Sequence, residues 1–137
     1  MKHEDFIRGL LFKWRFKKAG KILVGRNVII RGWKNITLGD NVRLYDGVCL
    51  NASHGYINIG DDCDIGQYSY LDGGGGLNIG KACLIGIGVI ILTESNQYKF
   101  NPLMPIINQP VVRKEVNIGD DVWIGANAVI FPGVKIG

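Results

Sequence analysis

Residues 116–136 read VNIGDDVWIGANAVIFPGVKI, and an isoleucine returns in this stretch at every sixth position. The same period runs through much of the chain. Its aliphatic members are Leu38, Leu44, Leu50, Ile59, Ile65, Leu71, Ile79, Ile85, Ile91, Ile118, Ile124, Ile130 and Ile136. A period of six matches neither an α-helix nor the simple alternation of a β-strand. Such a repeat predicts a solenoid, in which successive coils stack on one another.

A second pattern marks the start of each expected coil: an aliphatic residue, any residue, a second aliphatic residue and a glycine. It occurs at Ile22–Gly25, Ile36–Gly39, Ile57–Gly60, Leu77–Gly80 and Val116–Gly119, at spacings of 14, 21, 20 and 39 residues. Three six-residue sides make a triangular coil of about 18 residues. The longest spacing therefore holds one coil and a loop, which we place at residues 93–115. Long loops on regular scaffolds are commonly functional.

Small residues follow most of the aliphatic positions four places later, and two of them are Cys63 and Cys83. We expect both to be buried free thiols that fill the core. Cys49 falls on an outward phase. Three cysteines without a CxxC pair predict neither a disulfide framework nor a zinc site. In the turns, the glycine after an aliphatic position and the Asp or Asn after it are expected to adopt positive φ.

Positive charge is concentrated at the start of the chain. Residues 1–21 hold seven basic and two acidic residues, a net charge of +5, whereas the remainder holds nine basic and ten acidic residues. Residues 2–19 predict one amphipathic helix, ended by Gly20, with an apolar stripe of Phe6, Ile7, Leu10, Leu11 and Trp14. Phe12 and Phe16 lie off that stripe.

Two roles for this N-terminal segment, residues 1–21, remain open. The helix could cover the open end of the solenoid domain, residues 22–137, or it could rest on an anionic membrane surface. The chain has no apolar run long enough to span a bilayer, and its start lacks the apolar core of a secretory signal. We therefore expect a cytoplasmic protein, with peripheral membrane contact as an option. The basic segment contains no recognisable nucleic-acid-binding module.

The repeat resembles that of the hexapeptide-repeat acyltransferases. Ile118–Ile130, followed by Pro132–Gly137, looks like the branch that acetylates sugars, capsular polysaccharides and xenobiotics, and so does the loop segment Pro105–Gln109. The resemblance implies an all-β fold, a left-handed parallel β-helix, with the N-terminal helix and one long loop added. It also implies a homotrimer with active sites between neighbouring solenoids.

In chemical terms, the resemblance implies O-acetylation of a sugar or polysaccharide hydroxyl by acetyl-coenzyme A, without a metal. Attack on the thioester needs a base for the hydroxyl proton and amide donors for the oxyanion. The resemblance places the thioester and pantetheine contacts at the amides of Gly125 and Ala126. Trp123 would line the coenzyme A cleft or pack in the trimer interface, and Lys135 would meet a phosphate.

The loop departs from the family pattern, which has an Asn-His pair near its start. Here Asn96 matches the asparagine and Gln97 occupies the position of the histidine, and residues 91–115 contain no histidine. A glutamine amide is not a base near neutral pH, so Gln97 could only position a substrate hydroxyl. Asn96 and Tyr98 are the expected substrate contacts.

His54 and Glu94 are the two remaining candidates for the catalytic base. Leu50, Leu71 and Ile91 are equivalent positions in successive coils, which places His54 at the corner from which the loop leaves. At two coil rises, His54 would lie about 10 Å from Ser95. His54 could also be an ordinary surface residue, and Glu94, if solvated, would be a weak base.

Two other functions remain in view. The missing loop histidine and a last coil that is unfinished at Gly137 would suit a non-catalytic trimeric binding or scaffold protein. A metal-dependent enzyme of the γ-carbonic anhydrase kind needs three histidine ligands across a trimer interface, and the chain has only His3 and His54.

Overall fold

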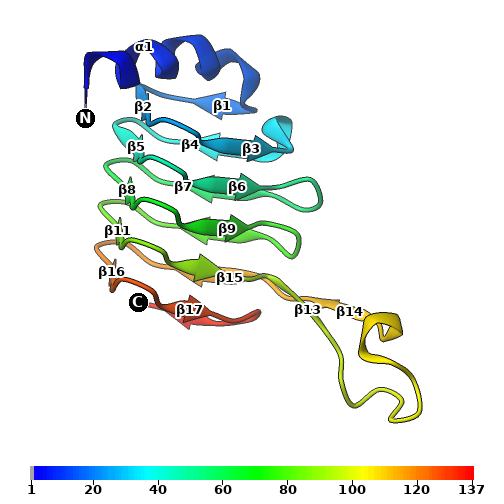
Figure 1. The fold of residues 1–137 in the computed structure, drawn as a ribbon. Coiled ribbons are helices and arrows are strands. Elements are labelled where there is room, and N and C mark those ends of the chain that lie inside the picture. The colour runs from blue at the N-terminus through cyan, green and yellow to red at the C-terminus, as the bar shows by residue number, and fades with distance from the viewer. Residues whose placement is uncertain (1) are drawn as a thin grey trace.

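The computed structural model describes residues 2–137, and their strands form a three-sided solenoid of stacked coils (Figure 1). Each side is a parallel sheet. Sheet A contains β1 (Lys18–Ala19), β4 (Ile36–Leu38), β7 (Ile57–Ile59), β10 (Leu77–Ile79), β15 (Val116–Ile118) and β18 (Lys135–Ile136). Sheet B contains β2 (Ile22–Val24), β5 (Val42–Leu44), β8 (Asp64–Ile65), β11 (Leu84–Ile85) and β16 (Trp123–Ile124). Sheet C contains β3 (Ile29–Arg31), β6 (Cys49–Asn51), β9 (Tyr70–Asp72), β12 (Ile90–Ile91) and β17 (Val129–Ile130).

The register of these sheets confirms the six-residue period. Leu50 pairs with Leu71, which in turn pairs with Ile91. The side chains at these positions point inward and are fully buried. Cys63 and Cys83 are buried free thiols, as predicted, and Cys49 is half-buried. The core is therefore a column of aliphatic side chains that runs the length of the solenoid.

In the turns, an Asn or Asp adopts the positive φ, and a glycine allows the neighbouring coil to approach closely. Positive φ falls on the Asn or Asp, as at Asn41 (56°) and Asp62 (59°). The glycine before them is needed for close approach of the neighbouring coil, since a Cβ on Gly60 would lie 2.7 Å from the carbonyl oxygen of Gly80. The expectation of positive φ was thus right for the polar residues and wrong for the glycine, whose role is steric.

The N-terminal helix is shorter than predicted. α1 spans His3–Phe12, and a 3₁₀ turn, η1 (Lys13–Arg15), follows it. The chain is then extended, because the amide of Lys17 donates to the carbonyl oxygens of Trp33 and Ile36 and β1 joins sheet A. The second 3₁₀ turn, η2, spans Trp33–Asn35.

α1 lies across the N-terminal end of the solenoid (Figure 1), so the predicted cover is present. The apolar stripe is not what covers it, however. Asp5 and Gly9 are the buried residues of α1, and the Phe16 ring packs on Trp33 with centroids 4.8 Å apart. The boundary proposed at residue 21 stays a prediction. No helix within residues 2–137 combines the length and the apolar character needed to cross a membrane.

The loop predicted at residues 93–115 projects from the solenoid (Figure 1). It starts and ends in a two-stranded antiparallel ribbon, β13 (Glu94–Asn96) with β14 (Val111–Arg113), and its tip contains the 3₁₀ turn η3 (Ile106–Asn108).

Candidate functional site

The root of the loop is held by the buried pair Asp72 and Thr93. One carboxylate oxygen of Asp72 accepts hydrogen bonds from the Thr93 amide (2.9 Å) and hydroxyl (2.7 Å), and the other accepts from the Gly74 amide (3.1 Å). The Thr93 hydroxyl also accepts from the Gly75 amide, at 2.8 Å. These bonds fix the direction in which residue 94 leaves the solenoid.

Glu94, the next residue, turns back over the glycine run. Its Oε1 accepts a hydrogen bond from Nε of Arg113 on the opposite strand of the ribbon, at 3.1 Å. A Cβ on Gly74 would stand 1.5 Å from the same oxygen. Gly74 therefore leaves the space that the Glu94 carboxylate occupies.

His54 and Glu94 share a hollow of about 220 Å³ on the outer surface of this corner. The hollow is lined by Asn51, His54, Tyr70, Asp72, Gly74, Leu92 and Glu94. His54 is exposed, and the Asn51 side-chain amide donates to the Tyr70 hydroxyl at 3.2 Å. Residues that the sequence places 40 positions apart are thus brought together, and an imidazole and a carboxylate can both reach a molecule bound there.

Gln97, Asn96 and Tyr98 lie along a second hollow, of about 470 Å³, beneath the ribbon. It is lined by Ser95, Asn96, Gln97, Tyr98, Lys99, Phe100, Val112, Lys114, Phe131 and Pro132. Ser95 thus faces a different hollow from His54. Gln97 is half-buried, whereas Asn96 and Tyr98 are exposed. The position of the family histidine therefore borders the larger hollow, and the two candidate bases border the smaller one.

The loop tip is organised by Gln109, which is buried. Its amide nitrogen donates to the carbonyl oxygens of Asn101 (2.8 Å) and Met104 (3.0 Å), and its amide oxygen accepts from the Asn101 backbone at 3.2 Å. The Asn96 side chain donates to the Gln109 carbonyl at 3.4 Å. Gln109 thus ties the tip to the strand that carries the candidate substrate contacts.

The four residues predicted to hold coenzyme A are divided between two regions. Trp123 is exposed on the outer side of sheet B, and Gly125 and Ala126 follow it at an exposed turn. A Cβ on Gly125 would meet nothing within 4 Å. Lys135 belongs to sheet A, opposite Asn117. The structure does not bring Lys135 to Trp123, and the assigned roles of all four residues stay predictions.

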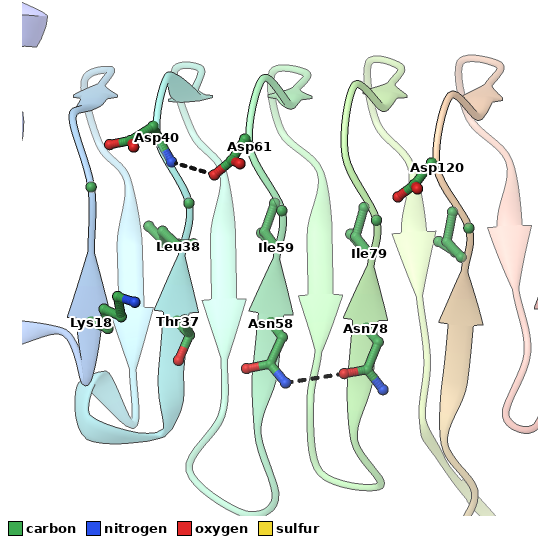
Figure 2. A pocket seen from close by; sticks show the side chains of 16 residues that line it. Lys18, Thr37, Leu38, Asp40, Asn58, Ile59, Asp61, Asn78, Ile79 and Asp120 are labelled. Carbon is green, nitrogen blue, oxygen red and sulfur yellow. Dashed lines mark hydrogen bonds between the residues drawn. The ribbon is translucent and has the colours of Figure 1, made fainter.

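A further hollow, of about 640 Å³, follows the outer face of sheet A. Figure 2 shows asparagines aligned on successive strands there, with Asn58 donating to Asn78 at 3.0 Å. The ladder continues from Asn78 to Asn117 at 2.9 Å and from Asn117 to Glu115 at 2.7 Å. Its polar groups satisfy one another, and none of the candidate bases lines it, so we do not place the chemistry on this face.

The ladder ends at a hydrogen bond from the Tyr56 hydroxyl to the Glu115 carboxylate. This bond raises the pKa of Tyr56 above its usual value and lowers the pKa of Glu115. Within residues 2–137, no three His, Cys, Asp or Glu side chains gather closely enough to hold a metal ion.

Sequence reasoning missed Asp72, Tyr70, Asn51 and Arg113. One signal was available for Asp72, an acidic residue that directly follows the inward Leu71 and precedes the run Gly73–Gly76. Arg113 had no signal, because its contact with Glu94 depends on how the ribbon closes.

Comparisons with known proteins agree with this architecture. Residues 115–137 match the family model described as the hexapeptide repeat of succinyl-transferase. The dTDP-4-amino-4,6-dideoxy-D-glucose acyltransferase of Escherichia coli is 32% identical over 130 residues, which cover 88% of this chain and 68% of that protein. A chloramphenicol acetyltransferase of Agrobacterium fabrum is 31% identical over 123 residues, 77% of this chain and 59% of that protein.

Among solved structures, a point variant of AntD, an N-acyltransferase from Bacillus cereus, superimposes with a TM-score of 0.81 and 28% identity over 95% of this chain and 71% of that chain. That structure contains dTDP-4-amino-4,6-dideoxyglucose and coenzyme A. Another AntD structure, with a TM-score of 0.80 and 27% identity, contains dTDP and 3-hydroxybutyryl-CoA.

The stacked coils and the projecting loop define a left-handed parallel β-helix of the acyltransferase type. The chain belongs to the hexapeptide-repeat acyltransferases. The solenoid expected from the six-residue period, and the family and left-handed fold implied by the resemblance, are therefore confirmed.

Proposed function

We propose that this protein transfers an acyl group from acyl-coenzyme A to a nucleotide-linked amino sugar, at the hollow between His54 and Glu94. The observation that carries the proposal is the meeting of these two side chains at the root of the loop. The E. coli and B. cereus relatives, whose names specify an amino-sugar acyltransferase and an N-acyltransferase, support it.

The missing loop histidine favours an amine as the acceptor. A neutral amine attacks a thioester without prior removal of a proton, and the proton leaves after the new C–N bond has begun to form. The amide bond then forms as the C–S bond breaks, and coenzyme A leaves as its thiol. His54 or Glu94 need only take the proton released by the nitrogen and return it to the departing sulfur. A hydroxyl acceptor, as in the O-acetylation expected from the sequence, depends more strongly on a base.

Acyl-coenzyme A is the proposed co-substrate, with acetyl as the first acyl group to test. Trp123, Gly125, Ala126 and Lys135 are kept as its proposed contacts. The amides after Trp123 lie at an exposed turn that a thioester carbonyl can approach. The non-catalytic scaffold draws no support from the relatives described above, which are named as acyltransferases.

A homotrimer is the proposed assembly, with sheet C as the contact face. Its outward column is Ile29, Cys49, Tyr70, Ile90 and Val129. Three of these side chains, those of Ile29, Ile90 and Val129, are exposed and apolar, in contrast to the asparagine ladder on sheet A. Light scattering should report a trimer that Ile90→Glu dissociates, whereas Thr37→Glu on sheet A leaves the trimer intact. A monomeric wild-type protein would overturn this assignment.

The test of function supplies acetyl-coenzyme A with a dTDP-amino sugar, or with the matching sugar that carries a hydroxyl instead. Released coenzyme A is measured by chromatography. We expect release with the amino sugar, lowered by about 10²-fold or more in His54→Ala or Glu94→Gln, and unchanged in the exposed control Glu4→Gln. Release only with the hydroxyl sugar would select O-acylation, and release with neither would overturn the proposal.

A further inference from the structure

α1 packs on the solenoid with the side that carries Asp5, Gly9 and Phe12. A Cβ on Gly9 would stand 2.0 Å from the carbonyl oxygen of Ile22, so the helix backbone lies directly on β2. Asp5 is buried on the same side, and its carboxylate accepts from the Arg8 guanidinium and from the Lys2 amide (2.6 Å). These contacts determine which side of the helix faces the solenoid.

Four residues of the apolar stripe consequently point away from the protein, whereas the fifth, Phe6, is half-buried. Each residue advances about 100° around a helix, so Ile7 and Leu11, two places beyond Asp5 and Gly9, lie nearly opposite the buried side. Their exposed fractions are 44% and 68%, and those of Leu10 and Trp14 are 51% and 80%. A surface helix normally turns its apolar stripe toward the core. An outward stripe indicates an apolar partner outside the chain.

Positive charge surrounds this stripe. Residues 1–21 carry a net charge of +5, and among residues 2–21 the one ion pair is Arg8 with Asp5. The ammonium of Lys13 lies 5.8 Å from the Trp14 ring centroid, and that of Lys21 lies 5.7 Å from the Phe6 ring centroid. Lysines therefore stand beside the apolar rings, as they do on helices that lie in a membrane interface.

A hollow of about 230 Å³ runs beside the stripe. It is lined by Phe6, Gly9, Leu10, Lys13, Gly20, Lys21 and Ile22. Its walls are mostly apolar and two lysines border it, which suits an amphiphile with an apolar chain and an anionic head group.

We propose that the outward face of α1 and η1, formed by Ile7, Leu10, Leu11 and Trp14 with the surrounding lysines, binds the surface of an anionic phospholipid bilayer. α1 lies across the end of the solenoid (Figure 1), so the helix can lie flat on the bilayer with the coils standing away from it. A second copy of this chain is a poorer partner, because it would bring one +5 segment against another. The inference does not depend on the proposed acyl transfer.

The experiment is sedimentation of the full-length protein with vesicles of phosphatidylcholine alone, or with about 30% phosphatidylglycerol. We expect binding to the anionic vesicles, weak binding to the neutral ones, and release when salt shortens the range of the charge attraction to a few ångströms. Equal binding to both vesicles, or binding to neither, would overturn the proposal.

Matched variants locate the contact. Leu11→Ser combined with Trp14→Ser should lower the affinity for anionic vesicles by at least about tenfold. Leu103→Ser, which removes a 93% exposed leucine from the loop tip, should not change it. Unchanged circular dichroism would establish that the double variant is folded. Wild-type affinity in the double variant would overturn the assignment to α1. A wild-type complex without lipid that the double variant dissociates would also overturn it, in favour of contact between copies.

Discussion

The carboxylate of Asp72 accepts hydrogen bonds from both the amide and the hydroxyl of Thr93, one coil further along the solenoid. Both residues are buried. Thr93 is the last residue before the ribbon, so this pair sets the direction of the loop. The position of Glu94, and with it the candidate site, depends on a contact that the hexapeptide repeat does not itself require.

Asp72→Ala should destabilise the protein by about 2 kcal/mol, because the buried amide and hydroxyl of Thr93 would lose their acceptor. Acyl transfer should fall as well, since Glu94 would no longer be held over the hollow. Denaturant unfolding measures the first effect and coenzyme A release the second. Asp72→Asn keeps one acceptor oxygen, so its stability and its activity should lie between those of the wild-type protein and those of Asp72→Ala. A fully stable Asp72→Ala protein would contradict the anchoring role.

Gly74→Ala and Gly75→Ala should separate activity from stability. The three atoms nearest to a methyl group at residue 74 all belong to the flexible Glu94 side chain. A methyl group at residue 75 instead meets backbone, at 2.5 Å from the Thr93 carbonyl oxygen and 2.8 Å from the Lys114 nitrogen. We expect Gly74→Ala to lose activity while its free energy of unfolding falls by less than about 1 kcal/mol. In Gly75→Ala the free energy of unfolding should fall by about 2 kcal/mol or more. The reverse order in unfolding experiments would refute the assignment.

Gln109→Ala should release the loop tip without unfolding the solenoid. The substitution removes both donors and the acceptor that connect Gln109 to Asn101 and Met104. Trypsin should then cleave after Lys99 at least about tenfold faster, because cleavage requires a locally open chain. Gln67→Ala, in the solenoid, is the control. Equal cleavage rates in both variants would show that Gln109 does not order the loop.

Alkaline pH should weaken the fold through Cys63. Burial raises the pKa of this thiol to about 11. The stabilisation of the folded state by the un-ionised Cys63 thiol is complete below about pH 8.5, the ordinary thiol pKa. It is lost as pH rises toward 11, because this thiol ionises at a lower pH in the unfolded chain than in the folded one. Mass spectrometry after iodoacetamide treatment at neutral pH should find Cys63 unmodified until denaturant is added. Rapid native modification would contradict its burial.

The contact between Tyr56 and Glu115 should persist across the neutral range and fail at both extremes. Its hydrogen bond raises the pKa of Tyr56, so the contact is lost as pH rises above about 10, and it lowers the pKa of Glu115, so the contact is lost on acidification below about 4.3. In an ultraviolet titration, Glu115→Gln should move one tyrosine to a lower midpoint, and Tyr56→Phe should remove that component. An unchanged titration in Glu115→Gln would rule out the contact.

Much of the fold could be predicted because the backbone itself imposes the repeat. Inward side chains must recur at the same place on each side of a coil, so the six-residue period at Leu50, Leu71 and Ile91 encodes the register. The same reasoning placed the loop and the buried thiols. In the hollow that His54 and Glu94 share, the sequence predicted the place of His54 but not that of Glu94. The period put His54 at the correct corner, but the way in which Asp72 and Thr93 direct the chain brings Glu94 rather than Ser95 to it.

The orientation of the N-terminal helix could not be predicted from the periodicity of its residues. Its pattern establishes that one side is apolar, and nothing in that pattern says whether this side faces the solenoid or the solvent. That choice depends on long-range contacts, namely the close approach of Gly9 to the Ile22 carbonyl and the burial of the paired Asp5. Local spacing thus encodes the coils, since each repeat meets a copy of itself. The orientation of α1 and the composition of the candidate site depend on unlike segments that meet only in the folded chain.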